Sequence, residues 1–325
     1  MTVSGIRNRV RIWYLDGERQ TTRPRAQSKP MWITQIMSHL ITSDQLAKRL
    51  ASPDIVLFDC RFQLADPEYG RRSHAMNRVP GAHYVHLDHD LSSNVGDGSR
   101  GRHPLPDPQE FSDLMTRYGV SPSSQVICYD DVSGPFAARM WWLLHWIGHS
   151  NVQVLSGGFT KWVENGHPTQ SGSNSEQSSL DNGGTINTVV QSGLRVEMDQ
   201  VEAHIESLNL VDSRAKERYL GIEEPIDPVA GHIPGAVNIP WMDNLTSEGV
   251  FLSELDLRNR FLAAFSPDSI PVFYCGSGVT ACHNILATQI AGFPMPRLFA
   301  ESWSGWIHDD ERGIIKRGTS GESSS

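Results

Sequence analysis

Residues 270–284 place a cysteine where a strand is followed by a helix, a position suited to a nucleophile. An apolar run at 272–274 is typical of a buried strand and ends at Cys275, and a helix-compatible run follows at 279–290. The first N–H groups of a helix have no partner inside it, and together with the helix dipole they favour an anion. Glycines in the loop let its amides curl inward around negative charge. Since such surroundings favour the thiolate form of a cysteine, we predict that Cys275 is a nucleophile.

A free cysteine is more often a small buried hydrophobic residue than a reactive one. This structural role is the alternative for Cys275, but its place at a strand end, directly before Gly-Ser-Gly-Val-Thr, argues against it. Cys282 lies within the predicted helix, and Cys60 and Cys128 end apolar runs that have no glycine loop behind them. We assign these three cysteines to the core.

The composition is that of a soluble globular protein. The chain has 325 residues, of which 38% are hydrophobic and 20% charged, and this length suits two domains of about 150 residues. The net charge of −9 argues against nucleic acid as a partner, and no apolar run approaches the ~20 residues of a membrane span. Four cysteines in so long a chain do not form a disulfide framework, which favours a reducing compartment. We expect a cytoplasmic protein that binds neither nucleic acid nor membrane.

Residues 1–36 differ from the rest because they are rich in arginine and poor in acidic residues. Such a leader is typical of an organelle transit peptide, which makes a mitochondrial location the alternative. Prolines at positions 24 and 30 would break an amphipathic helix. This favours a disordered extension, or a start codon upstream of the true one.

The sequence contains an internal repeat of about 150 residues. The matching segments are 55–59 with 208–212, 78–83 with 232–237, 126–130 with 271–275 and 158–162 with 302–306. Strands alternate with helical segments in both copies, which predicts an α/β protein of two domains, each a mainly parallel sheet flanked by helices. Residues 136–147 are apolar nearly all round, which predicts a buried helix between the domains.

The repeat and the composition together predict the domain boundaries. We place an extension at 1–36, the first domain at 37–169, a linker at 170–190, the second domain at 191–312 and a disordered tail at 313–325. The linker contains a Ser-, Gly- and Asn-rich stretch that is typical of flexible connections. Where the second copy has Cys275, the first has Asp130. We therefore predict one active site per chain, in the second domain, with the first domain as a non-catalytic scaffold.

The repeat, the turn His-Ile-Pro-Gly-Ala at 232–236 and the stretch Cys-Gly-Ser-Gly-Val-Thr-Ala-Cys at 275–282 resemble the two-domain rhodanese-type sulfurtransferases. The loop is most similar to their 3-mercaptopyruvate sulfurtransferase branch, and the resemblance covers about residues 40–309. It implies two tandem rhodanese-like domains and an enzyme that takes sulfane sulfur from a small-molecule donor. The sulfur would be held as a persulfide of Cys275 and passed to cyanide, thioredoxin or another thiol. We expect no cofactor and no metal.

The residues of the loop suit this chemistry. Six successive amides, from position 276 to 281, could hold the persulfide anion. The hydroxyls of Ser277 and Thr280 could donate hydrogen bonds to this anion or to the departing group, and helix capping is the alternative role for both. The predicted site therefore comprises Cys275, Ser277 and Thr280 together with a cradle of Gly276, Gly278, Val279 and Ala281.

Two further residues are candidates for substrate binding. Arg218 matches a family arginine that binds the anionic group of the donor, and a guanidinium suits a carboxylate or two thiosulfate oxygens. A surface charge on a helix is its alternative role, and nearby Arg214 is assigned to structure. Trp303 lies where family members have a loop that lines the active site, so it is a candidate for substrate contact, with a core position as the alternative.

Departures from the family pattern bear on the choice of donor. The second carboxylate-binding arginine of animal mercaptopyruvate enzymes is replaced by Asp227, as in thiosulfate-preferring rhodaneses. Those rhodaneses have basic residues directly after the cysteine, where this chain has Gly276 and Ser277. A first-domain histidine, implicated in a serine-linked relay in mercaptopyruvate enzymes, falls at Arg78. Because the loop touches the reacting sulfur, we predict 3-mercaptopyruvate as the donor, with thiosulfate as the alternative.

Other kinds of site fit the sequence less well. Phosphatases of the same fold use Cys-x5-Arg, but Ala281 stands six residues after Cys275, and no Cys-x-x-Cys redox pair is present. Cys275, Cys282 and His283 do not have a zinc spacing, and the histidines at 83, 86 and 89 are assigned to a solvated loop. The alternative from another class is a persulfide carrier without turnover, which activity with purified protein would distinguish from an enzyme.

Overall fold

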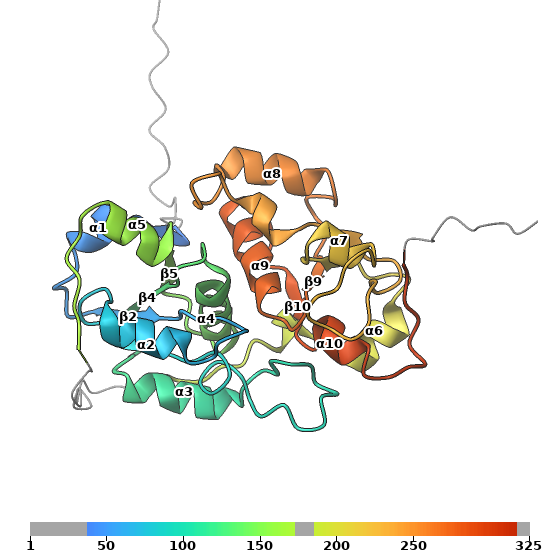
Figure 1. The fold of residues 1–325 in the computed structure, drawn as a ribbon, viewed down its shortest axis with the longest axis horizontal. Helices are drawn as coiled ribbons and strands as arrows, with labels where there is room; N and C mark the ends of the chain where they lie inside the picture. The colour runs from blue at the N-terminus through green and yellow to red at the C-terminus, as the bar shows by residue number, and fades with distance from the viewer. Residues whose placement is uncertain (1–37, 173–184, 317–325) are drawn as a thin grey trace, which may run out of the picture. The chain divides into compact units, whose positions relative to one another are not determined.

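Each half of the chain folds around a parallel five-stranded sheet (Figure 1). The structure is a computed structural model that describes residues 38–172 and 185–316. Strand order is β1-β5-β4-β2-β3 in the first sheet and β6-β10-β9-β7-β8 in the second, so each strand has a counterpart in the other half. The predicted repeat and the predicted α/β class are both confirmed.

The elements of the first half follow the alternation expected from the sequence. Its strands are β1 (Leu40–Ile41), β2 (Ile55–Asp59), β3 (His83–Tyr84), β4 (Gln125–Tyr129) and β5 (Val152–Leu155). Its helices are α1 (Ser43–Ala47), α2 (Tyr69–Met76), α3 (Pro108–Arg117), α4 (Pro135–Trp146) and α5 (Gly158–Glu164). Side-chain oxygens of Thr42 and Asp107 cap the first turns of α1 and α3, which explains where these helices begin.

The second half repeats this arrangement with shorter elements. Its strands are β6 (Arg195–Val196), β7 (Leu210–Asp212), β8 (Val237–Asn238), β9 (Val272–Tyr274) and β10 (Arg297–Phe299). Its α-helices are α6 (Met198–His204), α7 (Lys216–Tyr219), α8 (Glu254–Leu262), α9 (Thr280–Ile290) and α10 (Ser302–Trp306). Two 3-10 helices, η1 (Ser192–Leu194) and η2 (Trp241–Asn244), complete this half.

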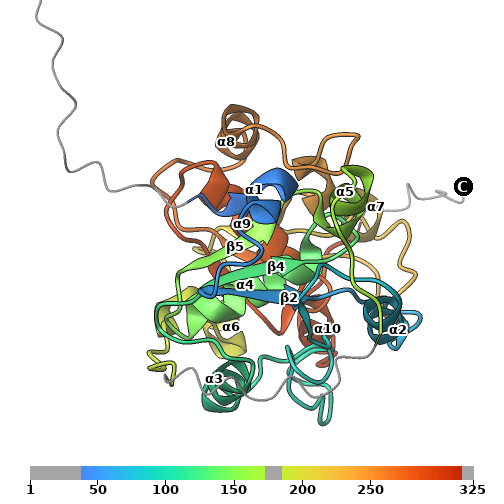
Figure 2. The same ribbon diagram turned by 90° about the vertical axis from the view of Figure 1, so that its left-hand side faces the viewer.

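Alternate residues of each central strand face opposite layers of helices. In the first sheet, Leu57 and Ile127 pack in one cluster with residues of α1 and α5, and Phe58 and Val126 pack in another with residues of α3 and α4. Figure 2 shows α1 and α5 on one side of this sheet and α3 on the other. In the second sheet, α6 and α10 cover one face, and α8 and α9 cover the other.

One continuous core joins the two halves. Helix α4 packs against α9, and the same hydrophobic cluster contains buried residues of both helices and of both sheets. Trp141 and Trp142 of α4 are fully buried there. The apolar stretch that predicted a helix between the domains therefore forms the contact that holds the two sheets together.

Some of the predicted boundary segments are more structured than expected. Gln170, placed in the linker, pairs with Arg78, and Ile315, placed in the tail, pairs with His232. The amide of Val189 donates to the carbonyl of Ile147 at 3.0 Å. The predicted extension at 1–36, the middle of the linker and the end of the tail lie outside the described residues. No helix among the described residues is long and apolar enough to cross a membrane.

Candidate active site

The start of α10 fixes the backbone on both sides of Cys275, which follows β9 directly. The carbonyl of Cys275 accepts from the N–H of Trp303 at 3.0 Å, and its own N–H donates to Oγ of Ser302 at 3.2 Å. The carbonyl of Gly276 accepts from the N–H of Ser304 at 2.9 Å. The carbonyls of Cys275 and Gly276 and the amide of Cys275 therefore attach the beginning of the loop to α10. The amides of the residues after Cys275 take no part in this attachment.

Gly278 makes the turn from the loop into α9. Its φ is +74°, and a Cβ at this position would lie 2.5 Å from the carbonyl oxygen of Ala300. A side chain would therefore strain the turn and clash with backbone. Its carbonyl accepts from Nη1 of Arg139, a buried residue of α4, at 3.1 Å. Gly278 thus shapes the loop and ties it to the first half.

Cys275 lines a cavity of about 160 Å³ whose walls come from both halves. The first half contributes Phe62, Leu64, Leu87, Arg102, His103 and Phe136, and the second contributes Arg218, Ile226, Cys275, Gly276, Ser277, Val279 and Thr280. Cys275 is only 1% exposed. The residue belongs to the hydrophobic core of the two halves and at the same time borders this cavity, whose wall also contains charged and polar residues.

Six of the predicted site residues line this cavity, and three do not. Gly278 and Ala281 flank it in the loop and in the first turn of α9, where only their backbone is available. Trp303 is fully buried in the core of the second half, where its Nε1 donates to the carbonyl of Val229 at 2.8 Å and its ring packs on the guanidinium of Arg214. The predicted contact of Trp303 with substrate is therefore wrong, and the tryptophan serves the fold.

The loop amides remain available for a ligand. Within the described part of the chain, the N–H groups of residues 276–281 donate no hydrogen bond to another protein group. Buried amides are nearly always paired in folded proteins, because an unpaired one is costly. An anion bound beside Cys275 would satisfy several of these amides at once.

The first half shows what such a loop does when it holds an anion. Oδ1 of Asp130 accepts from the amides of Val132 at 3.0 Å and Gly134 at 2.8 Å. Oδ2 accepts from the amides of Phe136 at 2.9 Å and Ala137 at 3.1 Å. Burial raises the pKa of Asp130 to about 6, against the effect of these amides, so the carboxyl is ionised at neutral pH. The first copy fills its own cradle, whereas the equivalent amides of the second are left open.

A histidine of the first half contacts the loop directly. Nδ1 of His103 lies 2.7 Å from Oγ of Ser277, and Nε2 lies 3.2 Å from Oδ1 of Asp88. Burial lowers the pKa of His103 despite the carboxylate beside it, so the ring is neutral at pH 7. The hydrogen bond from His103 in turn holds the pKa of Asp88 below its ordinary value. A neutral ring that donates from Nε2 to Asp88 accepts at Nδ1 from the Ser277 hydroxyl.

Two guanidinium groups lie next to Gly276, one from each half. Arg218 donates from Nη2 to Oδ2 of Asp227 at 2.9 Å and from Nε to Glu224 at 2.9 Å. Arg102 donates from Nη1 to Oδ1 of the same Asp227 at 2.5 Å. Asp227 is therefore a shared counter-ion of two cationic wall residues.

No spacing pattern in the sequence points to Asp88, Arg102 or His103. Arg78, the position at which the family resemblance puts the relay histidine, donates to the carbonyls of His74 and Gly172 and does not line the cavity. The segment 88–104 has no helical or strand periodicity, so spacing alone could not bring it to a loop 174 residues further along the chain. The available signal was a rigid, proline-rich stretch with adjacent arginine and histidine.

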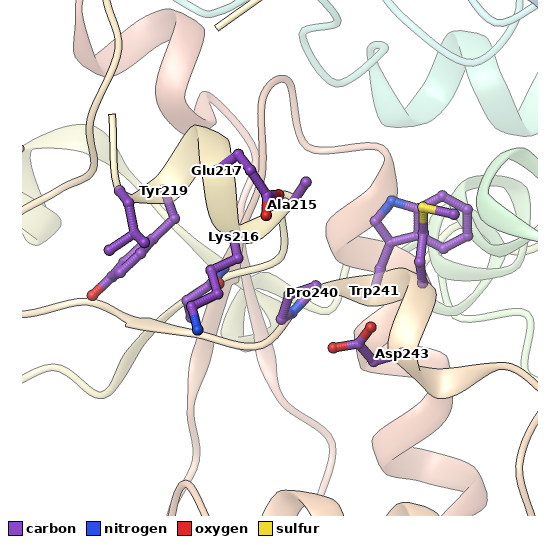
Figure 3. Close-up of a pocket in the computed structure, with 10 residues that line it drawn as sticks. Ala215, Lys216, Glu217, Tyr219, Pro240, Trp241 and Asp243 are labelled. Carbon is purple, nitrogen blue, oxygen red and sulfur yellow. The ribbon is translucent and has the colours of Figure 1, made fainter. Parts of the chain in front are cut away.

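A larger cavity of about 590 Å³ lies elsewhere in the second half. Figure 3 shows its wall, with Lys216, Glu217 and Tyr219 of α7 on one side and Trp241 and Asp243 of η2 on the other. Its lining residues include no cysteine and no histidine. Because the predicted nucleophile, Cys275, lines the smaller cavity and not this one, we place the candidate active site in the smaller cavity.

The rhodanese-like domain model matches residues 42–165 and again residues 197–309. A probable 3-mercaptopyruvate sulfurtransferase of Pseudomonas aeruginosa is 46% identical over 85% of this chain and 98% of its own length. The thiosulfate sulfurtransferase of Bos taurus is 32% identical over 79% of this chain and 86% of its own. The structure of the 3-mercaptopyruvate sulfurtransferase from Leishmania major matches with a TM-score of 0.74 at 30% identity, covering 82% of this chain and 73% of the other. The chain therefore belongs to the rhodanese family and carries two rhodanese-like domains in tandem.

Proposed function

We propose that this protein is a sulfurtransferase that moves sulfane sulfur from 3-mercaptopyruvate, through a persulfide of Cys275, to a thiol or cyanide acceptor. The observation that carries the proposal is the position of Cys275 in a small cavity, beside amides that donate no hydrogen bond to the described residues. Its relatives in Pseudomonas aeruginosa and Rattus norvegicus carry the name 3-mercaptopyruvate sulfurtransferase. Residues 191–312 then carry the nucleophile, and residues 37–169, which have Asp130 in its place, have no nucleophile of their own and contribute His103 to the same site.

In the first half-reaction, the Cys275 thiolate attacks the sulfur of the donor. A bond forms between the two sulfurs, and the carbon–sulfur bond of 3-mercaptopyruvate breaks. The electron pair of that bond leaves with pyruvate as its enolate, which takes up one proton. The outer sulfur remains on Cys275, where the open amides of the loop stabilise its negative charge.

Ser277 and His103 relay the proton in this scheme. Ser277 lines the cavity and its hydroxyl donates to Nδ1 of the neutral His103 ring, so the S–H proton of the donor can pass through the hydroxyl to the ring and return by the same route to the enolate carbon. Asp88 fixes the orientation of the ring. The donor's carboxylate lies toward Arg218, whose side chain lines the same cavity.

In the second half-reaction, an acceptor thiolate or cyanide attacks the outer sulfur. The bond between the two sulfurs breaks, the acceptor becomes a persulfide or thiocyanate, and Cys275 returns to the thiolate. Thioredoxin is one such thiol. A cytoplasmic location, or a mitochondrial one if residues 1–36 are a transit peptide, is part of this proposal.

Thiosulfate is the second candidate donor, and Arg102 is the observation that favours it. This guanidinium supplies positive charge beside Gly276, where the loop itself has none. Steady-state rates with cyanide as acceptor and each donor in turn decide between the two. Negligible turnover with both would instead favour a persulfide carrier that receives sulfur from another protein.

The central test is Cys275→Ser. We expect this variant to lose sulfur transfer with both donors, since it loses the thiolate, and to keep the fold because the side chain changes little in volume. Mass spectrometry of donor-treated protein should show one added sulfur in the natural protein and none in the variant. Cys282→Ser is the matched control, because burial raises the pKa of that thiol to about 12 and keeps it out of the reaction. Retained transfer in Cys275→Ser would refute the assignment.

A further inference from the structure

The wall of the active-site cavity contains one cation that has no place in the scheme above. Arg102 comes from the first half, lines the cavity and is 27% exposed at its side chain. It donates from Nη1 to Asp227, while its Nε is buried and has no hydrogen-bond partner among the described residues.

Gly276 leaves a space between the guanidinium groups of Arg102 and Arg218. A Cβ on Gly276 would lie 3.1 Å from Nη2 of Arg102 and 3.5 Å from Nη2 of Arg218. Oδ2 of Asp227 lies 3.6 Å from the same point. A side chain at position 276 would crowd both guanidinium groups, whereas glycine leaves them accessible to an anion in the cavity that both arginines line.

The charges around this space limit the anion that it can hold. Asp227 and Glu224 balance Arg102 and Arg218, and the side chain of Asp227 is only 2% exposed. Oδ2 of Asp227 borders the same space beside Gly276 as the two guanidinium groups, and the four groups together carry no net charge. A monoanion adds one charge to this balanced set, whereas a dianion adds two and is repelled about twice as strongly by Asp227.

We propose that Arg102 is a donor-binding residue that, with Arg218, holds the anionic group of the sulfur donor, and that Asp227 sets the site for a monoanionic carboxylate. This inference rests on the proposed function, because it names the donor class of the same cavity. It gives the first half a direct part in substrate binding.

The first experiment measures binding without turnover. In protein that carries Cys275→Ser, calorimetry measures the affinity for 3-mercaptopyruvate with Arg102→Gln, with Arg102→Lys and with Arg100→Gln. Arg100 is the matched control, since it is exposed and bonds to Ser93 and the carbonyl of Asn94. We expect a loss of about 10-fold for Arg102→Gln, a smaller loss for Arg102→Lys and none for Arg100→Gln. Equal affinity in Arg102→Gln and Arg100→Gln would overturn the proposal.

The second experiment tests the selection by Asp227. With active protein, Arg102→Gln should raise the KM for 3-mercaptopyruvate by about 10-fold and change kcat much less. Asp227→Asn should raise the ratio of kcat/KM for thiosulfate to that for 3-mercaptopyruvate by about 10-fold, since it removes one negative charge. An unchanged ratio would overturn the role of Asp227. Absence of turnover in the natural protein would refute the sulfurtransferase proposal, while the binding experiment would still decide the role of Arg102.

Discussion

Ser277 and His103 form a pair in which a small side chain on the loop is held by a ring from the other half of the chain. The pair contributes to the rate only if the leaving group must be protonated. Pyruvate leaves 3-mercaptopyruvate as an enolate, which must be protonated at carbon, whereas sulfite leaves thiosulfate as a stable anion. The same hydrogen bond should therefore matter for one donor and hardly at all for the other.

This difference makes the pair testable. We expect Ser277→Ala and His103→Gln each to lower kcat with 3-mercaptopyruvate by roughly 100-fold, the scale of general acid catalysis, with little change in KM. The double variant should be no worse than either single one, because the two groups act as a unit. With thiosulfate the losses should stay below about 3-fold on the same reasoning. Equal losses with both donors would mean that the pair holds the loop in shape and moves no proton.

The turn between a strand and the following helix occurs once in each half of the molecule, and the two turns differ in the group that their amides surround. After β4 the turn is filled by the carboxylate of Asp130, and after β9 it begins with a thiol and open amides. A persulfide extends Cys275 by one sulfur and carries the negative charge that the amides lack. When Cys275 carries the persulfide, its anion should therefore accept hydrogen bonds from the loop amides of the second half, as the carboxylate of Asp130 does in the first half.

Loading should consequently stabilise the protein. We expect donor-treated protein to unfold at a temperature a few degrees higher than reduced protein, because an anion held by several amides contributes on the order of 1–3 kcal/mol. Differential scanning calorimetry before and after treatment measures the shift, and cyanide should reverse it by removing the sulfur. Cys275→Ser treated in the same way is the control and should not shift. A loaded protein that melts at the same temperature would show that the amides do not hold the sulfur.

The difference between local and tertiary information explains what the sequence could predict. The end of β9, the loop and α9 are consecutive in the chain, so their residue types predict a nucleophile without knowledge of the rest. Arg102 and His103 reach this loop only because the amide of Arg102 donates to Oγ of Ser304 at 3.0 Å and the first half packs against the second. Trp303 was misassigned for the same reason, since only packing reveals that its ring is covered. Local patterns therefore predicted half of the site and could not predict the residues that the other domain contributes.

The contact between α4 and α9, which joins the two halves of the molecule, includes polar groups as well as apolar side chains. Arg139 of α4 is fully buried and donates to the carbonyls of Gly278 and His103, which belong to the two loops that form the cavity. His283 of α9 lies 3.1 Å from the carbonyl of Ser133 in the first half, and its ring stacks on Phe251 at 4.5 Å. The two domains are thus joined by polar contacts that depend on the charge state of buried groups.

His283 makes this contact sensitive to acid. Burial lowers the pKa of His283 to about 3, and that of His145 on α4 to about 4. In the unfolded chain a histidine titrates near 6.5, so below that pH the unfolded state binds protons that the folded state excludes. Stability that is fully present above pH 6.5 is therefore lost as the pH falls. Asp130 acts in the opposite direction, because its raised pKa lets the folded state take up a proton near pH 6.

We expect the loss to be measurable for His283 alone. Urea unfolding at pH 7 and pH 5 should show that the natural protein loses about 2 kcal/mol more free energy of unfolding than His283→Gln, in which the amide can still donate to the carbonyl of Ser133 but does not titrate. His204→Gln is the control, since His204 is exposed, and it should follow the natural protein. The same loss in all three proteins would contradict a role for His283. A smaller loss in His283→Gln alone would show that an uncharged imidazole stabilises the contact between the two domains.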